Sequence, residues 1–92
     1  MGAELDEVFL DAHHAARAVS QAVETRQVFG RNLRHARVTA GLTTGDIQDR
    51  AGVPREFVDE VEQGLADSSL RTMVILALAV ERDLWLLLEP SG

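Results

Sequence analysis

The sequence predicts an all-α fold, a bundle of about five helices, from three observations. Apolar residues recur at steps of three and four along most of the chain, which is the spacing of one helical face. Gly or Ser separates these stretches at short intervals, so the connections between helices are short. The chain contains no internal repeat and no low-complexity run, which argues against a repeat architecture.

The first helix is expected over residues 3 to 29, because Gly30 is the first residue in its path that can break or hinge it. One face of this helix is apolar, and acids and Gln stand opposite. The apolar positions are Leu5, Val8, Phe9, Ala12, Ala16, Val19 and Val23. This face either packs within the molecule or forms a surface for a dimer or another protein.

Two shorter helices are expected next. An apolar stripe over residues 31 to 40 ends at Gly41, a typical C-terminal stop. The following helix runs from about Thr44 to Ala51, and either Thr43 or Thr44 can cap its N-terminus.

Pro54 then stands in a first turn, where it removes no helical hydrogen bond, and a helix over residues 55 to 63 follows. Ser68 or Ser69 caps the next helix, residues 70 to 80. That helix has so few polar positions that we expect it to be buried on most sides, as the central core helix.

The tail is expected to start at Asp83. As a strand, it would place Trp85 and Leu87 on one face, and pairing with the same segment of a second copy would cover its edge. A last helical turn fits its Leu-rich run as well. In either form we expect Trp85 in the core or in a dimer interface rather than stacked on a ligand.

Composition excludes several classes of protein. With 92 residues, 46% of them hydrophobic, the chain is one small folded domain. The absence of Cys excludes a disulfide scaffold and cysteine chemistry. The apolar run at residues 73 to 80 is too short for a membrane span, and the acidic N-terminus does not look like an export signal. We therefore expect a cytoplasmic protein with no membrane partner.

The charge is distributed unevenly along the chain. The net charge is −6, whereas most dedicated nucleic-acid binders carry a basic excess. Residues 1 to 25 sum to −4, residues 26 to 55 to +4, residues 56 to 62 to −4 and residues 63 to 92 to −2. A basic middle segment therefore lies between acidic flanks and could supply phosphate contacts.

The segment GLTTGDIQDRAGVPREFVDEVEQG, residues 41 to 64, has helix-turn-helix spacing and resembles the lambda repressor/Cro-like (XRE-type) helix-turn-helix family without a gap. The matching positions are Leu42, Ile47, Ala51, Gly52, Val53, Val58, Val61, Glu62 and Gly64. The resemblance implies a helix-turn-helix domain over residues 29 to 82. Residues 1 to 28 would be an extra amphipathic helix, and the tail, residues 83 to 92, is similar to that of antitoxin-type members.

The core of that family closes without the extra helix, so we favour a dimer or partner surface there. The residues expected in it are Leu5, Val8, Phe9, Ala12 and Val19, together with Trp85 and Leu87 of the tail.

The resemblance implies that residues 55 to 63 form the recognition helix. The expected DNA-binding residues are Thr43, Thr44, Arg55, Glu56, Phe57, Asp59 and Glu60, with Arg31, Arg34 and Arg50. The sequence departs from the family here, because three carboxylates stand where Ser, Thr or Arg is usual, and Pro54 stands where Ser is frequent. Phe57 occupies a position that is exposed in the family, and an exposed Phe among acids suggests contact with a protein.

Steps of three place Arg31, Arg34 and Arg37 on one side of a helix. They could follow a phosphate backbone. Alternatively they form a solvated face, with Arg34 or Arg37 paired to Glu62, as the resemblance implies.

Other kinds of site are not indicated. His13, His14 and His35 are too few and wrongly spaced for a metal site. The sequence carries no catalytic triad pattern and no Gly-rich phosphate loop, so we expect no enzyme activity, no cofactor and no small-molecule ligand.

Two functions remain. The resemblance favours a small transcription regulator that binds a two-fold operator in double-stranded DNA as a homodimer. The acidic recognition helix favours a protein-interaction module, antitoxin-like or regulator-binding, on the same fold.

Overall fold

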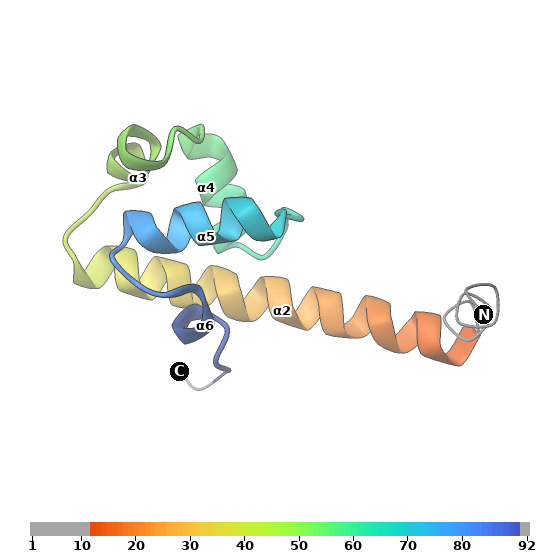
Figure 1. The fold of residues 1–92 in the computed structure, drawn as a ribbon. Coiled ribbons are helices and arrows are strands. Elements are labelled where there is room, and N and C mark those ends of the chain that lie inside the picture. The colour runs from red at the N-terminus through yellow and green to blue at the C-terminus, as the bar shows by residue number, and fades with distance from the viewer. Residues whose placement is uncertain (1–11, 91–92) are drawn as a thin grey trace.

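The computed structural model describes residues 12 to 90, which form five α-helices and no strand. In the labels of Figure 1 the helices are α2 (Ala12–Thr39), α3 (Thr44–Ala51), α4 (Arg55–Glu62), α5 (Leu70–Ala79) and α6 (Leu84–Leu87). The long helix α2 contacts α4 and α6, while α3 contacts α4 and α5. The predicted all-α fold is confirmed.

The short helices begin where the sequence predicts. Of the two candidate caps for α3, Thr43 is the N-cap: its Oγ1 accepts a hydrogen bond from the Asp46 backbone N–H at 3.0 Å. The Asp46 carboxylate in turn accepts from the Thr43 N–H at 2.8 Å, which completes a capping box. Ser69 caps α5, because its Oγ accepts from the Thr72 N–H at 3.1 Å.

The expectation that Gly30 breaks or hinges the first helix is wrong. The helix α2 continues through this residue to Thr39. A Cβ atom on Gly30 would lie 2.2 Å from the carbonyl oxygen of Val61 in α4, so a side chain does not fit there. Gly30 therefore allows close approach of two helices, although Gly costs a helix interior about 1 kcal/mol relative to Ala.

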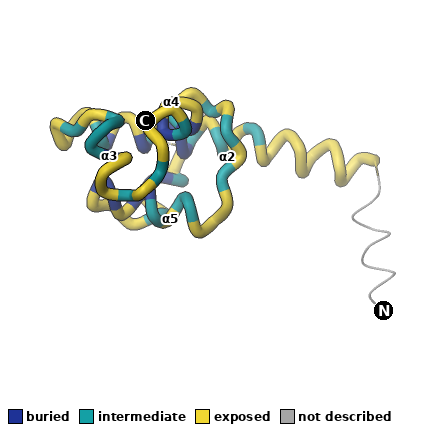
Figure 2. Tube along the Cα trace, turned by 90° about the horizontal axis from the view of Figure 1, so that it is seen from above, coloured by how far each residue is buried: buried dark blue, intermediate teal, exposed yellow. Residues whose placement is uncertain are grey.

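The core lies between the C-terminal half of α2 and the shorter helices. Its fully buried large side chains are Phe29, Leu33, Ile47, Val58, Leu76 and Val80. The N-terminal half of α2 projects from this core (Figures 1 and 2), and residues 12 to 22 are exposed throughout. Ala12 and Val19 are among them; Leu5, Val8 and Phe9 lie outside the described residues.

Of the two forms expected for the tail, the strand is wrong and the helical turn is confirmed, because residues 84 to 87 form the short helix α6. The Asn32 side chain of α2 donates from Nδ2 to the Leu87 carbonyl at 3.0 Å and to the Glu89 carbonyl at 2.7 Å. These bonds hold the tail against α2 and bury Leu87, which is only 4% exposed. Leu87 is therefore a core residue and not part of a dimer surface, while Trp85 is 66% exposed.

The expectation that the helix over residues 70 to 80 is buried on most sides is also wrong. Leu76, Ala77 and Ala79 of α5 are buried, but another face of the helix points outward. That face carries Leu70, Val74 and Leu78, spaced by four residues, and Leu78 is 62% exposed. Within residues 12 to 90, no helix has both the length and the hydropathy that crossing a bilayer requires.

Candidate nucleic-acid interface

The helices α3 and α4 form a helix-turn-helix unit. Gly52 ends α3 in the left-handed conformation with φ 71°, and its N–H donates to the Gln48 carbonyl at 2.9 Å. The two helices contact each other, and the buried side chains of Ile47 and Val58 tie them into one core. The outer side of α4 is left exposed, with Arg55, Glu56, Asp59 and Glu60.

Gln48 fixes the start of α4, a role that sequence reasoning missed. The N-cap residue Pro54 makes no side-chain cap bond. Instead, Gln48 Oε1 accepts a hydrogen bond from the Arg55 backbone N–H at 2.8 Å. The available signal was that Pro54 has no capping side chain, so the first N–H groups of α4 need an acceptor from another segment.

The exposed surface of α4 is predominantly acidic. Arg55 is its one basic residue, and Arg55 Nε lies 3.6 Å from Glu56 Oε2. Both side chains are mostly exposed, so this ion pair contributes little to stability and partly offsets the positive charge of Arg55. Asp59 and Glu60 add two more exposed carboxylates.

The expectation that the Phe57 side chain is exposed is wrong. The Phe57 side chain is half-buried and packs against the hydrophobic core. This packing removes the aromatic residue from the outer surface of α4, so Phe57 no longer argues for contact with a protein.

The remaining candidate arginines contact or line other parts of the fold. Arg50 Nη1 donates to the Ala79 carbonyl at 2.9 Å, at the C-terminal end of α5. Arg31 and Arg34 line a shallow hollow with Glu62, at the end of α4 opposite to Arg55. An eight-residue helix is about 12 Å long, so the structure does not bring these two arginines together with Arg55.

Arg37 is the arginine that pairs with Glu62. Its Nε and Nη2 donate to Glu62 Oε2 and Oε1 at 2.6 and 2.8 Å, and Nη1 donates to the Leu42 carbonyl at 2.9 Å. The hydrogen bonds to Glu62 raise the pKa of the Arg37 guanidinium above its ordinary value. The two-point pair ties the last residue of α4 to α2 and to the chain entering α3.

Thr43 and Thr44 lie at the start of α3. Thr43 Oγ1 accepts a hydrogen bond from the Asp46 backbone N–H, so the Thr43 side chain is engaged in the cap of α3. The hydrogen bond from the Thr43 backbone N–H lowers the pKa of the Asp46 carboxyl below its ordinary value, and the bond to the Thr43 side chain adds to the effect.

The histidines do not form a metal centre. The rings of His13 and His14 meet edge to face, with centroids 5.9 Å apart, and His35 lies roughly 30 Å further along α2. Among residues 12 to 90, no group of three His, Cys, Asp or Glu side chains could hold a metal ion.

No protein-family model and no curated protein matches the chain. Among solved structures, the fold is similar to the restriction-modification controller protein C.AhdI from Aeromonas hydrophila. The TM-score is 0.64 and the sequence identity is 31%, over 67% of this chain and 94% of C.AhdI. The helix-turn-helix unit and this similarity agree, and the chain belongs to the lambda repressor/Cro-like (XRE-type) helix-turn-helix family.

Proposed function

We propose that the protein is a transcription regulator that binds a two-fold DNA operator as a homodimer, with α4 of each protomer in the major groove. The observation that carries this proposal is the α3–α4 unit, whose outer side is exposed and polar while its inner side is built into the core. The similarity to a controller protein supports the same function.

Two groups are positioned for phosphate or base contacts. Arg55 stands in the first turn of α4, where its guanidinium can reach a guanine edge or a phosphate, and Gln48 holds that turn in place. The exposed N-terminus of α3, at Thr43, can face a phosphate. Glu56, Asp59 and Glu60 oppose non-specific binding, because they place three negative charges toward the phosphates.

The proposed dimer surface includes the outer face of α5 and the adjoining tail. Leu70, Val74 and Leu78 are exposed on α5, and Trp85 and Leu86 are exposed on α6, which packs against α5. Exposed apolar side chains gathered on two contacting helices are typical of an interaction surface. A two-fold dimer through this surface would present two copies of α4 to two half-sites.

A salt titration of binding to mixed-sequence duplex DNA tests the proposal. If α4 and the start of α3 contact phosphates, the logarithm of the binding constant falls steeply and linearly with the logarithm of salt concentration. Arg55→Ala should weaken binding and make this slope shallower, while Arg17→Ala on the projecting part of α2 serves as a matched control. Absence of any binding at low salt would contradict the proposal.

The acidic surface of α4 favours a second function, an interaction module for a basic protein. In that case, replacing Glu56, Asp59 and Glu60 by neutral amides weakens capture of the partner and leaves duplex binding negligible. Under the DNA proposal the same change strengthens duplex binding, so one set of variants distinguishes the two functions.

A further inference from the structure

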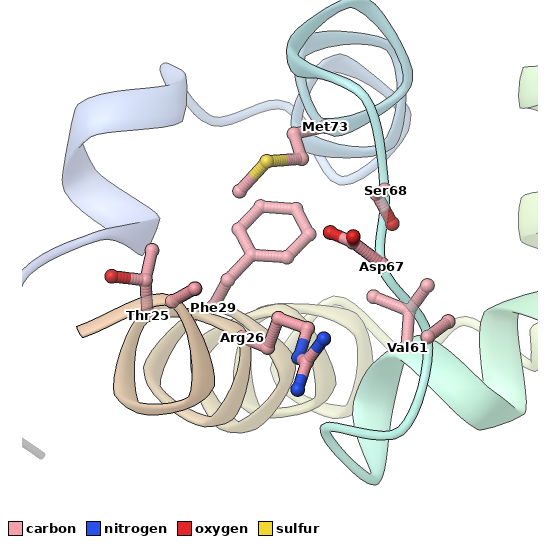
Figure 3. Close-up of a pocket in the computed structure, with 9 residues that line it drawn as sticks. Thr25, Arg26, Phe29, Val61, Asp67, Ser68 and Met73 are labelled. Carbon is pink, nitrogen blue, oxygen red and sulfur yellow. The ribbon is translucent and has the colours of Figure 1, made fainter. Parts of the chain in front are cut away.

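A pocket of about 240 Å³ lies between α2, the loop after α4 and the start of α5. Figure 3 shows Phe29, Val61 and Met73 around it, from α2, α4 and α5 respectively. Cavities of roughly 150 Å³ hold benzene, and pockets for drug-sized ligands begin near 300 Å³. The volume therefore suits a compound of about ten non-hydrogen atoms.

Two polar atoms in the lining of this pocket have no partner. Arg26 Nε and Ser68 Oγ are buried and make no hydrogen bond within the described part of the chain. In residues 12 to 90 they are the only buried side-chain nitrogen or oxygen atoms left in this state. Buried polar groups are nearly always hydrogen-bonded, so a ligand in the pocket would supply the hydrogen-bond partners that the protein does not provide for these two atoms.

The pocket also carries one charge of each sign. The Arg26 guanidinium enters its lining from α2, and the Asp67 carboxylate enters from the loop before α5, beside Ser68 (Figure 3). Among the ion pairs of the described residues, none joins these two side chains. A simple anion would face Asp67 and a simple cation would face Arg26, whereas a molecule with both charges complements both.

We infer that this pocket binds a small zwitterion with an apolar side chain, of the class of the apolar α-amino acids. The ligand carboxylate pairs with Arg26, and the ligand ammonium pairs with Asp67 and donates to Ser68. The apolar side chain fills the space between Phe29, Val61 and Met73. The sequence gives no sign of this site, because its lining comes from three segments that only the fold brings together.

The site touches the helix-turn-helix unit directly. Val61 belongs to α4, and its carbonyl oxygen lies where α2 and α4 approach each other at Gly30. A ligand against Val61 therefore contacts the end of α4 opposite to Arg55. The site itself does not depend on the proposed DNA function, and its test needs no DNA.

The test is a titration of the full chain with L-leucine and L-phenylalanine, followed by amide chemical shifts. We expect shifts in the residues around Phe29, Val61 and Met73, with a Kd of about 0.1 to 1 mM, which is usual for a ligand of this size. Phenethylamine lacks the carboxylate and 3-phenylpropanoate lacks the ammonium, so each should bind at least about fivefold more weakly than phenylalanine.

Variants locate the site. Arg26→Gln and Asp67→Asn should each weaken binding at least about fivefold. Arg17→Gln removes the same charge as Arg26→Gln from an exposed position of the same helix and should leave the Kd unchanged. Ala22→Leu should abolish binding, because Ala22 lines the pocket and the larger side chain would fill it.

Three results would overturn the inference: no shifts at about 10 mM of either amino acid, unchanged binding in Arg26→Gln, or equal binding of phenethylamine and phenylalanine. Each variant is checked for a folded spectrum before titration. If Arg26→Gln did not fold, Asp67→Asn and Ala22→Leu would decide the question in the same way.

Discussion

At the scale of single residues, Gly30 shows how little space separates α2 from α4. The contact that excludes a side chain there is with a backbone carbonyl, which cannot move aside as the end of a flexible side chain can. The same two helices are also joined by the ion pair between Arg37 and Glu62.

We therefore expect Gly30→Ala to lower the free energy of unfolding by about 2 to 3 kcal/mol, because the added methyl group forces the helices apart. The matched control is Gly45→Ala in α3, where a Cβ would meet only Thr43 Oγ1, at an ordinary 3.5 Å. Gly45→Ala should raise stability by roughly 0.5 to 1 kcal/mol through helix propensity. Urea unfolding of both variants tests this, and equal stability of the two would contradict it.

The capping box at α3 predicts a dependence on pH. The fold lowers the pKa of Asp46, so its ionised form is favoured by folding. The stabilisation is complete above the ordinary carboxyl pKa and is lost as the pH falls through the lowered value, below about pH 4. Asp46→Asn should therefore be less stable than the parent at pH 7, and the difference should shrink in acid.

Urea unfolding of both chains at pH 7 and in acid measures this difference. Asp49→Asn, also in α3, controls for the loss of one negative charge from the same helix. A difference between Asp46→Asn and the parent that stays constant down to the acid limit of folding would argue against a role for the ionised carboxylate.

At the scale of elements, α4 is firmly packed against the core, but the negative charge on its outer side is unfavourable for binding DNA. Val58 and Val61 hold its inner side, and Gln48 and Glu62 fix its two ends. Its outer side can therefore be changed without disturbing the fold. The electrostatics of this helix can be tested separately from its structure.

Replacing Glu56, Asp59 and Glu60 by Gln, Asn and Gln should raise non-specific DNA affinity tenfold or more, about 1.4 kcal/mol, because repulsion of the phosphates is removed. The control removes three exposed charges elsewhere, by Glu24→Gln, Asp83→Asn and Glu89→Gln. Fluorescence anisotropy with a short duplex measures both. If the control gains as much affinity as the α4 variant, net charge and not the position of α4 explains the effect.

Local signals were enough to predict where α3 and α5 begin. Thr43 and Ser69 begin α3 and α5 through bonds to residues three positions ahead, so a short window of sequence contains the whole cause. The pairing of Glu62 with an arginine followed from the resemblance, and the structure selects Arg37.

What sequence reasoning missed depends on contacts between distant residues. Gly30 meets α4, Asn32 holds the tail 55 positions away at Leu87, and Phe57 turns toward the core. The periodicity of apolar residues in the sequence cannot predict such contacts, because each depends on how two elements are placed in space. The contact residues proposed for DNA stay predictions for a related reason, since their role depends on a partner molecule.

At the scale of the whole molecule, the apolar surface of α5 and α6 predicts association. We expect light scattering to give about twice the chain mass of 10.1 kDa. Leu78→Glu should shift the protein to a monomer, because it places a charge in the proposed interface. Leu65→Glu is the control, since Leu65 is also mostly exposed but lies in the loop before α5. A monomeric parent chain at tens of micromolar, an order of magnitude set by ordinary interface affinities, would contradict the prediction.

Because α2 is one continuous helix, the number of residues in it determines which way the side chains of its projecting half face relative to α4. Each residue of an α-helix turns the chain by about 100° and advances it by about 1.5 Å. One residue inserted near Gln21 would therefore swing the side chains of residues 12 to 20 about a quarter turn around the axis, relative to α4. Seven inserted residues would complete nearly two turns and restore their direction about 10 Å farther out. The length of α2 therefore sets the orientation, relative to α4, of any molecule that binds the projecting half of the helix.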